Sequence, residues 1–229
     1  MFPLQDTIPS RSVPWVTWTI IFINTIAFFY ELLIPADELE RFVSLVGFVP
    51  ARFADDAGAA WTLVTCMFLH GGWAHFIGNM WMLYLFGDNV EDRMGPVRYL
   101  IFYLLCGIGA GVAHYVANPM STIPCIGASG AIAGVLGAYF KLFPTARVIT
   151  LVLILFWPLF FEIPAVLFIG IWFISQLWSG ALALVGPQYF VGVAWWAHVG
   201  GFVAGIMLVP LFAPESRHYH EYPDEYQPW

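Results

Sequence analysis

The sequence predicts an all-α, polytopic membrane protein in which six transmembrane helices form one bundle. Of its 229 residues, 60% are hydrophobic and only 10% are charged, whereas roughly a quarter of the residues of an ordinary soluble domain are charged. The apolar residues gather in runs, and one crossing of a hydrocarbon core needs about 20 such residues. Because every backbone polar group must be satisfied inside a membrane, these runs are expected to be helices.

Proline, glycine and charged residues bound the apolar runs and set the limits of the expected helices. The six runs cover residues 14–34, 73–90, 96–116, 128–142, 164–184 and 194–212. A further apolar run at residues 148–161 contains Pro158 and is shorter than a membrane crossing requires. We expect it to form a re-entrant or interfacial segment.

One membrane domain is expected to occupy most of the chain. The expected parts are a cytoplasmic N-terminal segment at residues 1–13, the six-helix domain at 14–212 and a cytoplasmic acidic tail at 213–229. Within the domain, a long first loop covers residues 35–72 and another loop covers residues 185–193.

Basic residues near the ends of the runs favour a cytoplasmic N-terminus, because cytoplasmic loops carry an excess of lysine and arginine. This orientation places six basic residues on the cytoplasmic side: Arg11, Arg93, Arg98, Lys141, Arg147 and Arg217. Arg41 and Arg52 then lie outside. With six crossings, both termini are expected in the cytoplasm.

Charge and cysteine content argue against several classes of protein. The net charge of −7 comes largely from solvated acidic segments, so no nucleic-acid partner is expected. Cys66, Cys106 and Cys125 are odd in number and widely spaced, which fits neither a disulfide framework nor a paired metal or redox motif. We interpret them as packing residues and expect no metal ion and no cofactor.

Polar residues lie near the expected starts of the second, fourth and sixth helices: His75 and Asn79, Ser129, and His198. Polar side chains inside a bilayer are costly and are functional candidates by default. All three helices would run from outside to inside, so their starts share one depth and the polar groups can meet.

Local spacing suggests a role for each of these residues. His75 and Asn79 are four residues apart and so share one helix face, whereas His70 is expected to hold the preceding loop. Glycines around Ser129 permit a sharp entry into a helix, whose unpaired first-turn N–H groups can bind an oxyanion.

Small residues predict close packing of the fourth and sixth helices. Gly130 and Gly134 on one helix, and Gly201 and Gly205 on the other, recur at a spacing that lets helix backbones approach closely. This contact would bring the sixth helix's histidine to the serine of the fourth.

A serine hydroxyl within reach of a histidine is a nucleophile beside its general base, and acyl transfer is the natural chemistry of such a pair. Donors on the second helix could stabilise the tetrahedral intermediate. The acids in apolar surroundings, Glu31 and Glu162, lie outside the three motif segments. The sequence therefore predicts a Ser–His dyad rather than a triad.

Three motifs in this order resemble those of the rhomboid family of intramembrane serine proteases, in its prokaryotic-type six-helix form. They are HxxxxHxxxN from His70 to Asn79, GASG from Gly127 to Gly130, and AHxxGxxxG from Ala197 to Gly205. The resemblance implies that Ser129 is the nucleophile and His198 the base. It also implies an oxyanion hole made by His75, Asn79 and the Ser129 backbone N–H.

The resemblance carries further expectations. The substrates would be single-pass transmembrane helices, cut near the outer face of a prokaryotic plasma membrane. The first loop would be embedded in the membrane, and residues 185–193 would form a cap over the site. Glu91 and Arg93 match a family pair that secures the turn after the second helix.

One position departs from the family pattern. Some members carry a tyrosine four residues after the serine, packed on the histidine, and Ala133 stands there in this chain. Another ring, Trp195 or Trp196, would then have to orient His198.

Three other functions stay open at this point. A rhomboid-like protein that only binds membrane clients is the nearest, although the serine and the histidine whose loss usually marks such proteins are both present. A metalloenzyme built on His70, His75 and His198 would lack an HExxH motif. A transporter would need polar groups that extend across the bilayer. The sequence predicts no particular oligomeric state.

Overall fold

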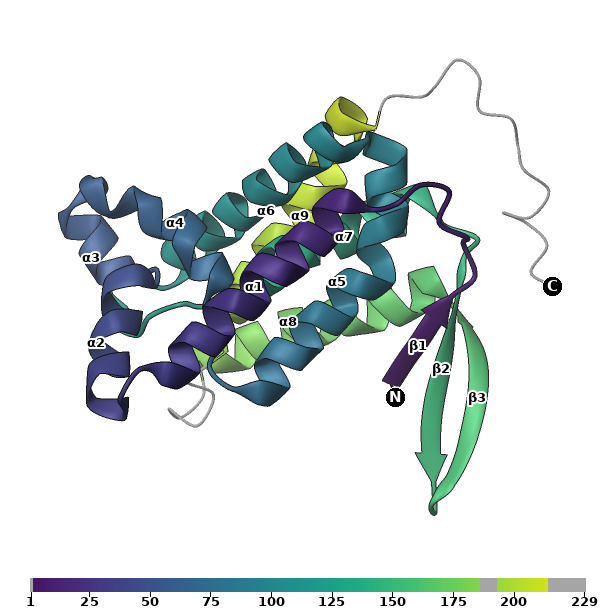
Figure 1. The fold of residues 1–229 in the computed structure, drawn as a ribbon, viewed down its shortest axis with the longest axis horizontal. Helices are drawn as coiled ribbons and strands as arrows, with labels where there is room; N and C mark the ends of the chain where they lie inside the picture. The colour runs from purple at the N-terminus through teal and green to yellow at the C-terminus, as the bar shows by residue number, and fades with distance from the viewer. Residues whose placement is uncertain (1, 186–192, 214–229) are drawn as a thin grey trace.

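A bundle of long helices dominates the computed structural model, which describes residues 2–185 and 193–213 (Figure 1). The long helices are α1 (Trp15–Leu33), α5 (Trp73–Met94), α6 (Pro96–Ala117), α7 (Ser129–Leu142), α8 (Ala165–Val185) and α9 (Trp195–Phe212). Four of them, α1, α6, α8 and α9, are long and apolar enough to cross a membrane.

The other two long helices fall short of that measure for different reasons. Helix α5 carries four charged residues in its last two turns, and α7 has only 14 residues. The structure therefore supports a multi-pass membrane protein with four candidate spans among the described residues, and the predicted count of six stays a prediction.

Helix α7 lies against four other helices, α5, α6, α8 and α9. Every residue from Gly130 to Tyr139 is buried. A Cβ atom placed on Gly201 would come within 1.9 Å of the Gly130 carbonyl oxygen, and one on Gly205 within 2.1 Å of the Gly134 oxygen. Only glycine permits this approach of α9 to α7, which is the contact that the small-residue pattern predicts.

A three-stranded antiparallel sheet corrects the all-α prediction. Its strands β1 (Phe2–Asp6), β2 (Arg147–Ile154) and β3 (Trp157–Pro164) lie in the order β1-β2-β3, and Figure 1 shows the β2–β3 hairpin extending beyond the helices. Valine, isoleucine and aromatic residues favour the extended conformation. The prolines of the sheet lie in its edge strands, where the missing N–H group breaks no ladder.

The first loop, residues 35–72, folds into short helical segments: α2 (Ala36–Val46), α3 (Pro50–Asp55), η1 (Ala57–Trp61), α4 (Thr62–Thr65) and η2 (Cys66–Phe68). Two backbone hydrogen bonds, of 3.1 and 2.7 Å, join Phe48 to Cys125, and the Gly127 N–H donates to the Cys66 carbonyl at 2.8 Å. The loop therefore fixes the extended segment that leads into α7.

Glu91, near the end of α5, holds the start of α1. Its carboxylate accepts from the backbone N–H groups of Val16 and Thr17 and from the Thr17 hydroxyl, at 2.8–2.9 Å. A carboxylate suits this position because the first N–H groups of a helix lack intrahelical partners. Arg93 lies over the ring of Phe143, 5.4 Å from its centre, so the pair expected to secure one turn joins α5 to two other segments.

The predicted loop at residues 185–193 and the tail at 213–229 fall mostly on residues 186–192 and 214–229, which lie outside the described part of the chain.

Candidate active site

Ser129 and His198 meet where α7 and α9 begin. Ser129 is the first residue of α7, and His198 lies in the first turn of α9. The Ser129 Oγ and the His198 Nε2 are 2.7 Å apart. The close packing of the two helices thus brings together the two side chains that the sequence analysis paired.

The hydrogen bond made by the other ring nitrogen of His198 determines which of the two nitrogens carries the proton. Its Nδ1 is 2.7 Å from the amide oxygen of Gln176 on α8. An amide oxygen can only accept a hydrogen bond, so Nδ1 carries the proton and Nε2 accepts from the Ser129 hydroxyl. This is the arrangement of a nucleophile beside its general base.

Gln176 was not among the candidates from the sequence. It is a buried amide within the apolar run at residues 164–184. The rule that a polar side chain in a membrane helix is a functional candidate would have found it. It belongs to no motif, however, and no spacing along the chain relates it to His198.

Two tryptophan rings flank His198, where the resemblance noted in the sequence implies a ring other than a tyrosine. The Trp195 ring lies 6.3 Å from the imidazole at 87°, and the Trp172 ring lies 6.0 Å from it at 38°. Trp195 is one of the two candidates named from the sequence. Trp196 packs against Gly180 of α8, and Trp172 was missed because it lies on α8 rather than beside the histidine motif.

His75 and Asn79 direct their nitrogen atoms at the segment before Ser129. His75 Nδ1 accepts from the Gly71 N–H at 3.3 Å, so its Nε2 carries the ring proton. A Cβ atom on Gly127 would lie 2.6 Å from that Nε2 and 3.5 Å from the Asn79 Nδ2. Two side-chain donors therefore point at one place beside Ser129.

The Asn79 amide nitrogen is buried and has no hydrogen-bond partner within the described residues. A buried donor without a partner costs about 1–3 kcal/mol, and such groups are uncommon in native structures. A carbonyl oxygen brought by a substrate would satisfy it.

His70 supports the site from the first loop. Its backbone N–H donates to both carboxylate oxygens of Glu31, at 3.1 and 3.2 Å, and its ring lies 5.2 Å from the ring of His75. Burial lowers the pKa of His70 to about 4, so the ring is neutral near pH 7. The backbone of His70 is thus bound to Glu31 of α1, and its ring packs against that of His75.

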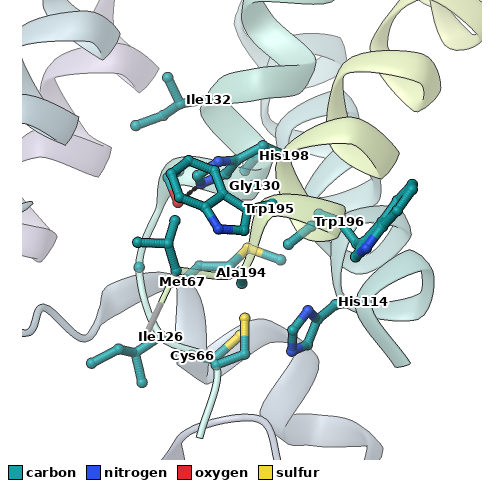
Figure 2. Close-up of a pocket in the computed structure, with 18 of the residues that line it drawn as sticks. Cys66, Met67, His114, Ile126, Gly130, Ile132, Ala194, Trp195, Trp196 and His198 are labelled. Atoms are coloured by element: carbon teal, nitrogen blue, oxygen red, sulfur yellow. Dashed lines mark hydrogen bonds between the residues drawn. The ribbon is translucent and has the colours of Figure 1, made fainter. Parts of the chain in front are cut away.

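A cavity of about 810 Å³ opens over these residues. Figure 2 shows the Trp195 ring beside His198, with Ile126 on one side of the pocket and Trp196 and His114 on the other. A largely apolar lining around a few convergent polar groups is typical of a ligand site.

A metal centre finds little support in this geometry. The part of the chain that the structure describes contains no group of three His, Cys, Asp or Glu side chains that could hold a metal ion. Both ring nitrogens of His198 are engaged by Ser129 and Gln176. Cys66, Cys106 and Cys125 are free thiols, with the first two buried.

The fold and the site together define a multi-pass membrane protein with a serine–histidine pair inside its helical bundle. Residues 57–215 match the family model of the rhomboid domain, and the chain belongs to the rhomboid family.

Curated relatives of the chain include proteins from a plant and a bacterium. RHOMBOID-like protein 5 of Arabidopsis thaliana is 28% identical over 74% of this chain and 50% of its own length. Two relatives in Bacillus subtilis are named as proteases: the putative rhomboid protease YdcA, 37% identical over 36% of this chain and 41% of its own length, and the rhomboid protease GluP, 43% identical over 35% and 15%. The chain thus spans half or less of the length of these relatives.

Proposed function

We propose that this chain is an intramembrane serine endopeptidase that cleaves single-pass transmembrane helices near the outer face of the membrane. The observation that carries the proposal is the 2.7 Å contact between Ser129 Oγ and His198 Nε2, with the opposite ring nitrogen bound to an acceptor. The two Bacillus relatives named as proteases support the same reaction class.

The reaction would begin with attack of Ser129 Oγ on the scissile carbonyl carbon while His198 Nε2 takes the hydroxyl proton. The negative charge on the carbonyl oxygen would be met by N–H donors of His75, Asn79 and the Ser129 backbone. His198 would then give its proton to the leaving amine, which breaks the peptide bond and leaves an acyl group on Ser129. Water activated by His198 would release the acyl group.

The length of α7 suggests where this chemistry takes place. Its 14 residues span about 21 Å as a helix, whereas the hydrocarbon core is roughly 30 Å thick. If α7 reaches the cytoplasmic surface at its C-terminal end, Ser129, which lines the cavity, lies below the outer surface. A substrate helix must therefore become extended there before its backbone reaches Ser129.

The site fits cleavage better than the alternatives from the sequence. A protein that only binds membrane clients needs no histidine with a fixed tautomer beside a serine. A transporter needs polar groups along a path across the bilayer, but α7 is apolar and buried from Gly130 to Tyr139 apart from the hydroxyl of Tyr139.

The test is incubation of purified protein in detergent with a panel of single-span substrates. We expect cleavage without added metal, cofactor or ATP, and no cleavage by Ser129→Ala. Activity that a chelator removes and zinc restores would contradict the proposal in favour of a metalloenzyme. Absence of cleavage, together with no reaction of Ser129 with a fluorophosphonate, would favour a protein that only binds clients.

A further inference from the structure

The amide of Gln176 lies where an apolar side chain would be expected. Residues 165–183 of α8 form a candidate membrane span, and the Gln176 side chain is only 6% exposed. Burial of an amide away from water costs free energy unless its oxygen and nitrogen find partners. Gln176 has partners for both.

The hydrogen bonds of Gln176 determine the orientation of its amide. Its nitrogen donates to the Ser175 hydroxyl at 3.0 Å and to the Trp172 carbonyl at 3.4 Å, while its oxygen lies 2.7 Å from His198 Nδ1. The opposite orientation would place the amide oxygen against the Trp172 carbonyl, which cannot donate. The amide oxygen is therefore presented to His198.

We propose that Gln176 is the third member of the catalytic arrangement, a positioning residue that holds the proton of His198 on Nδ1 and keeps Nε2 free for Ser129. This inference rests on the proposed function. In serine proteases with a triad, a carboxylate in this position fixes the tautomer and orientation of the histidine and stabilises the imidazolium that forms. A neutral amide oxygen fixes the ring in the same way and stabilises the imidazolium by its dipole.

The location of Gln176 explains why an amide occupies this position rather than an acid. An ionised carboxylate inside an apolar membrane helix is strongly disfavoured, whereas an amide supplies an acceptor without a net charge. Because Gln176 is not an acid, the acidic residues of the sequence indicate a dyad. The structure instead places Ser129, His198 and Gln176 in one hydrogen-bonded row.

Gln176 also couples His198 to the helix beside it. The Trp172 carbonyl accepts from the Gln176 amide, and the Trp172 ring flanks the imidazole. One turn of α8 thus supplies both the hydrogen bond and an aromatic face to the base.

The test compares Gln176→Met, which removes the acceptor at similar volume, with Gln176→Glu, which keeps an oxygen in either protonation state. Ile174→Met is the matched control, because Ile174 is 65% exposed on the same helix. Loss of a hydrogen bond to a group that becomes charged should lower kcat of Gln176→Met about ten- to a hundredfold with KM unchanged. Gln176→Glu should restore most of the rate, and Ile174→Met should match wild type.

Two further measurements separate this inference from the proposed function. The rate at which a fluorophosphonate modifies Ser129 should fall in Gln176→Met as kcat does, and it requires no peptide substrate. ¹⁵N NMR of histidine-labelled protein, with the His198 signals assigned by difference from His198→Ala, should show a protonated Nδ1 in wild type and mixed tautomers in Gln176→Met.

The NMR result tests the role of Gln176 even if no substrate is cleaved. A single Nδ1-protonated tautomer in both proteins would overturn the inference. Wild-type kcat in Gln176→Met would overturn it while leaving the protease proposal intact.

Discussion

His75 presents its protonated Nε2 to Gly127, so closely that a Cβ atom on Gly127 would lie 2.6 Å from that nitrogen. Gly127 also has a φ of +119°, a conformation that side chains rarely adopt. Glycine at this position therefore permits the backbone conformation that leads into α7. It also leaves space in front of the N–H donors of His75 and Asn79.

Gly127→Ala is expected to abolish cleavage. Its methyl group would fill the space proposed for the oxyanion. We expect kcat to fall by at least roughly 100-fold, the loss that is typical when one oxyanion-hole donor is removed. The left-handed conformation should lower the free energy of unfolding by about 1–2 kcal/mol. Measurements of kcat and of the melting temperature check both parts.

Gly72→Ala is the matched control for this variant. Gly72 has a φ of +139°, and a Cβ atom there would have nothing within 4 Å. The Gly72→Ala variant has the same kind of backbone strain as Gly127→Ala, but its methyl group does not enter the site. It should therefore be less stable than wild type and keep its activity. Equal activities of the two alanine variants would exclude the space beside Gly127 as the oxyanion site.

Asn79→Ala is expected to separate activity from stability. Removal of one oxyanion donor typically costs on the order of 100- to 1000-fold in kcat, and less if His75 and the backbone share the load. The Asn79 amide nitrogen has no partner among the described residues, so its removal breaks no hydrogen bond. We expect a lower kcat with an unchanged or raised melting temperature. Wild-type rates in Asn79→Ala, His75→Ala and the double variant would rule out this oxyanion hole.

The sequence predicted the parts of the site that local spacing encodes. His75 and Asn79 share a helix face, and glycines mark the contact that joins Ser129 to His198. Gln176 and Trp172 were missed because their position depends on how α8 is rotated against α9, which no local pattern records.

The sheet was missed for a related reason. A short apolar run gives no period that separates a strand from a membrane segment. Strand β1 also pairs with residues far along the chain, as Phe2 does with Leu151. Such a non-local pairing leaves no trace in either segment taken alone.

Glu91→Ala is expected to destabilise the bundle more than it affects the chemistry. It would leave the backbone N–H groups of Val16 and Thr17 without their partner, and an unsatisfied buried donor such as the Thr17 N–H costs about 1–3 kcal/mol. The melting temperature should fall, while the reaction of Ser129 with a fluorophosphonate at low temperature should keep its wild-type rate. A normal melting temperature with no reaction would assign Glu91 to the site instead of the scaffold.

Asp6 should make stability depend on pH. It is buried in strand β1, where the Tyr139 hydroxyl donates to it at 2.5 Å and the Asn89 amide at 2.7 Å. Burial nevertheless raises its pKa from 3.8 to about 7. The unfolded chain therefore loses this proton at lower pH than the folded chain, so the contribution of Asp6 is fully present below pH 4 and is lost as the pH rises to about 7.

Asp6→Asn is the variant that isolates this effect, because an amide cannot ionise at that position. Urea unfolding followed from pH 4 to pH 8 should show a smaller decline in the free energy of unfolding for Asp6→Asn than for wild type. Parallel curves for the two proteins would show that Asp6 titrates normally in the folded state.

The β2–β3 hairpin should return the chain to the side of the membrane from which it came. Arg147 pairs with Pro164 across the hairpin, and the Ala165 N–H donates to the Ala146 carbonyl at 2.8 Å. The end of α7 and the start of α8 are therefore neighbours. With α8 as the single crossing between them, Ser129 and His198 open their helices in the same leaflet.

Cysteine labelling in lipid vesicles tests this topology in a background that lacks the native cysteines. Thr145→Cys and Glu162→Cys, at the base of the hairpin, should react with an impermeant reagent from the cytoplasmic side, and Ile123→Cys and Val193→Cys from outside. At the hairpin tip Phe156 is 98% exposed among other exposed apolar side chains, and such a surface favours contact with lipid. Phe156→Cys should therefore resist the reagent in vesicles and react after denaturation. If positions 145 and 162 were labelled from opposite sides, Ser129 and His198 would lie in different leaflets. That result would contradict both the 2.7 Å contact between them and the topology.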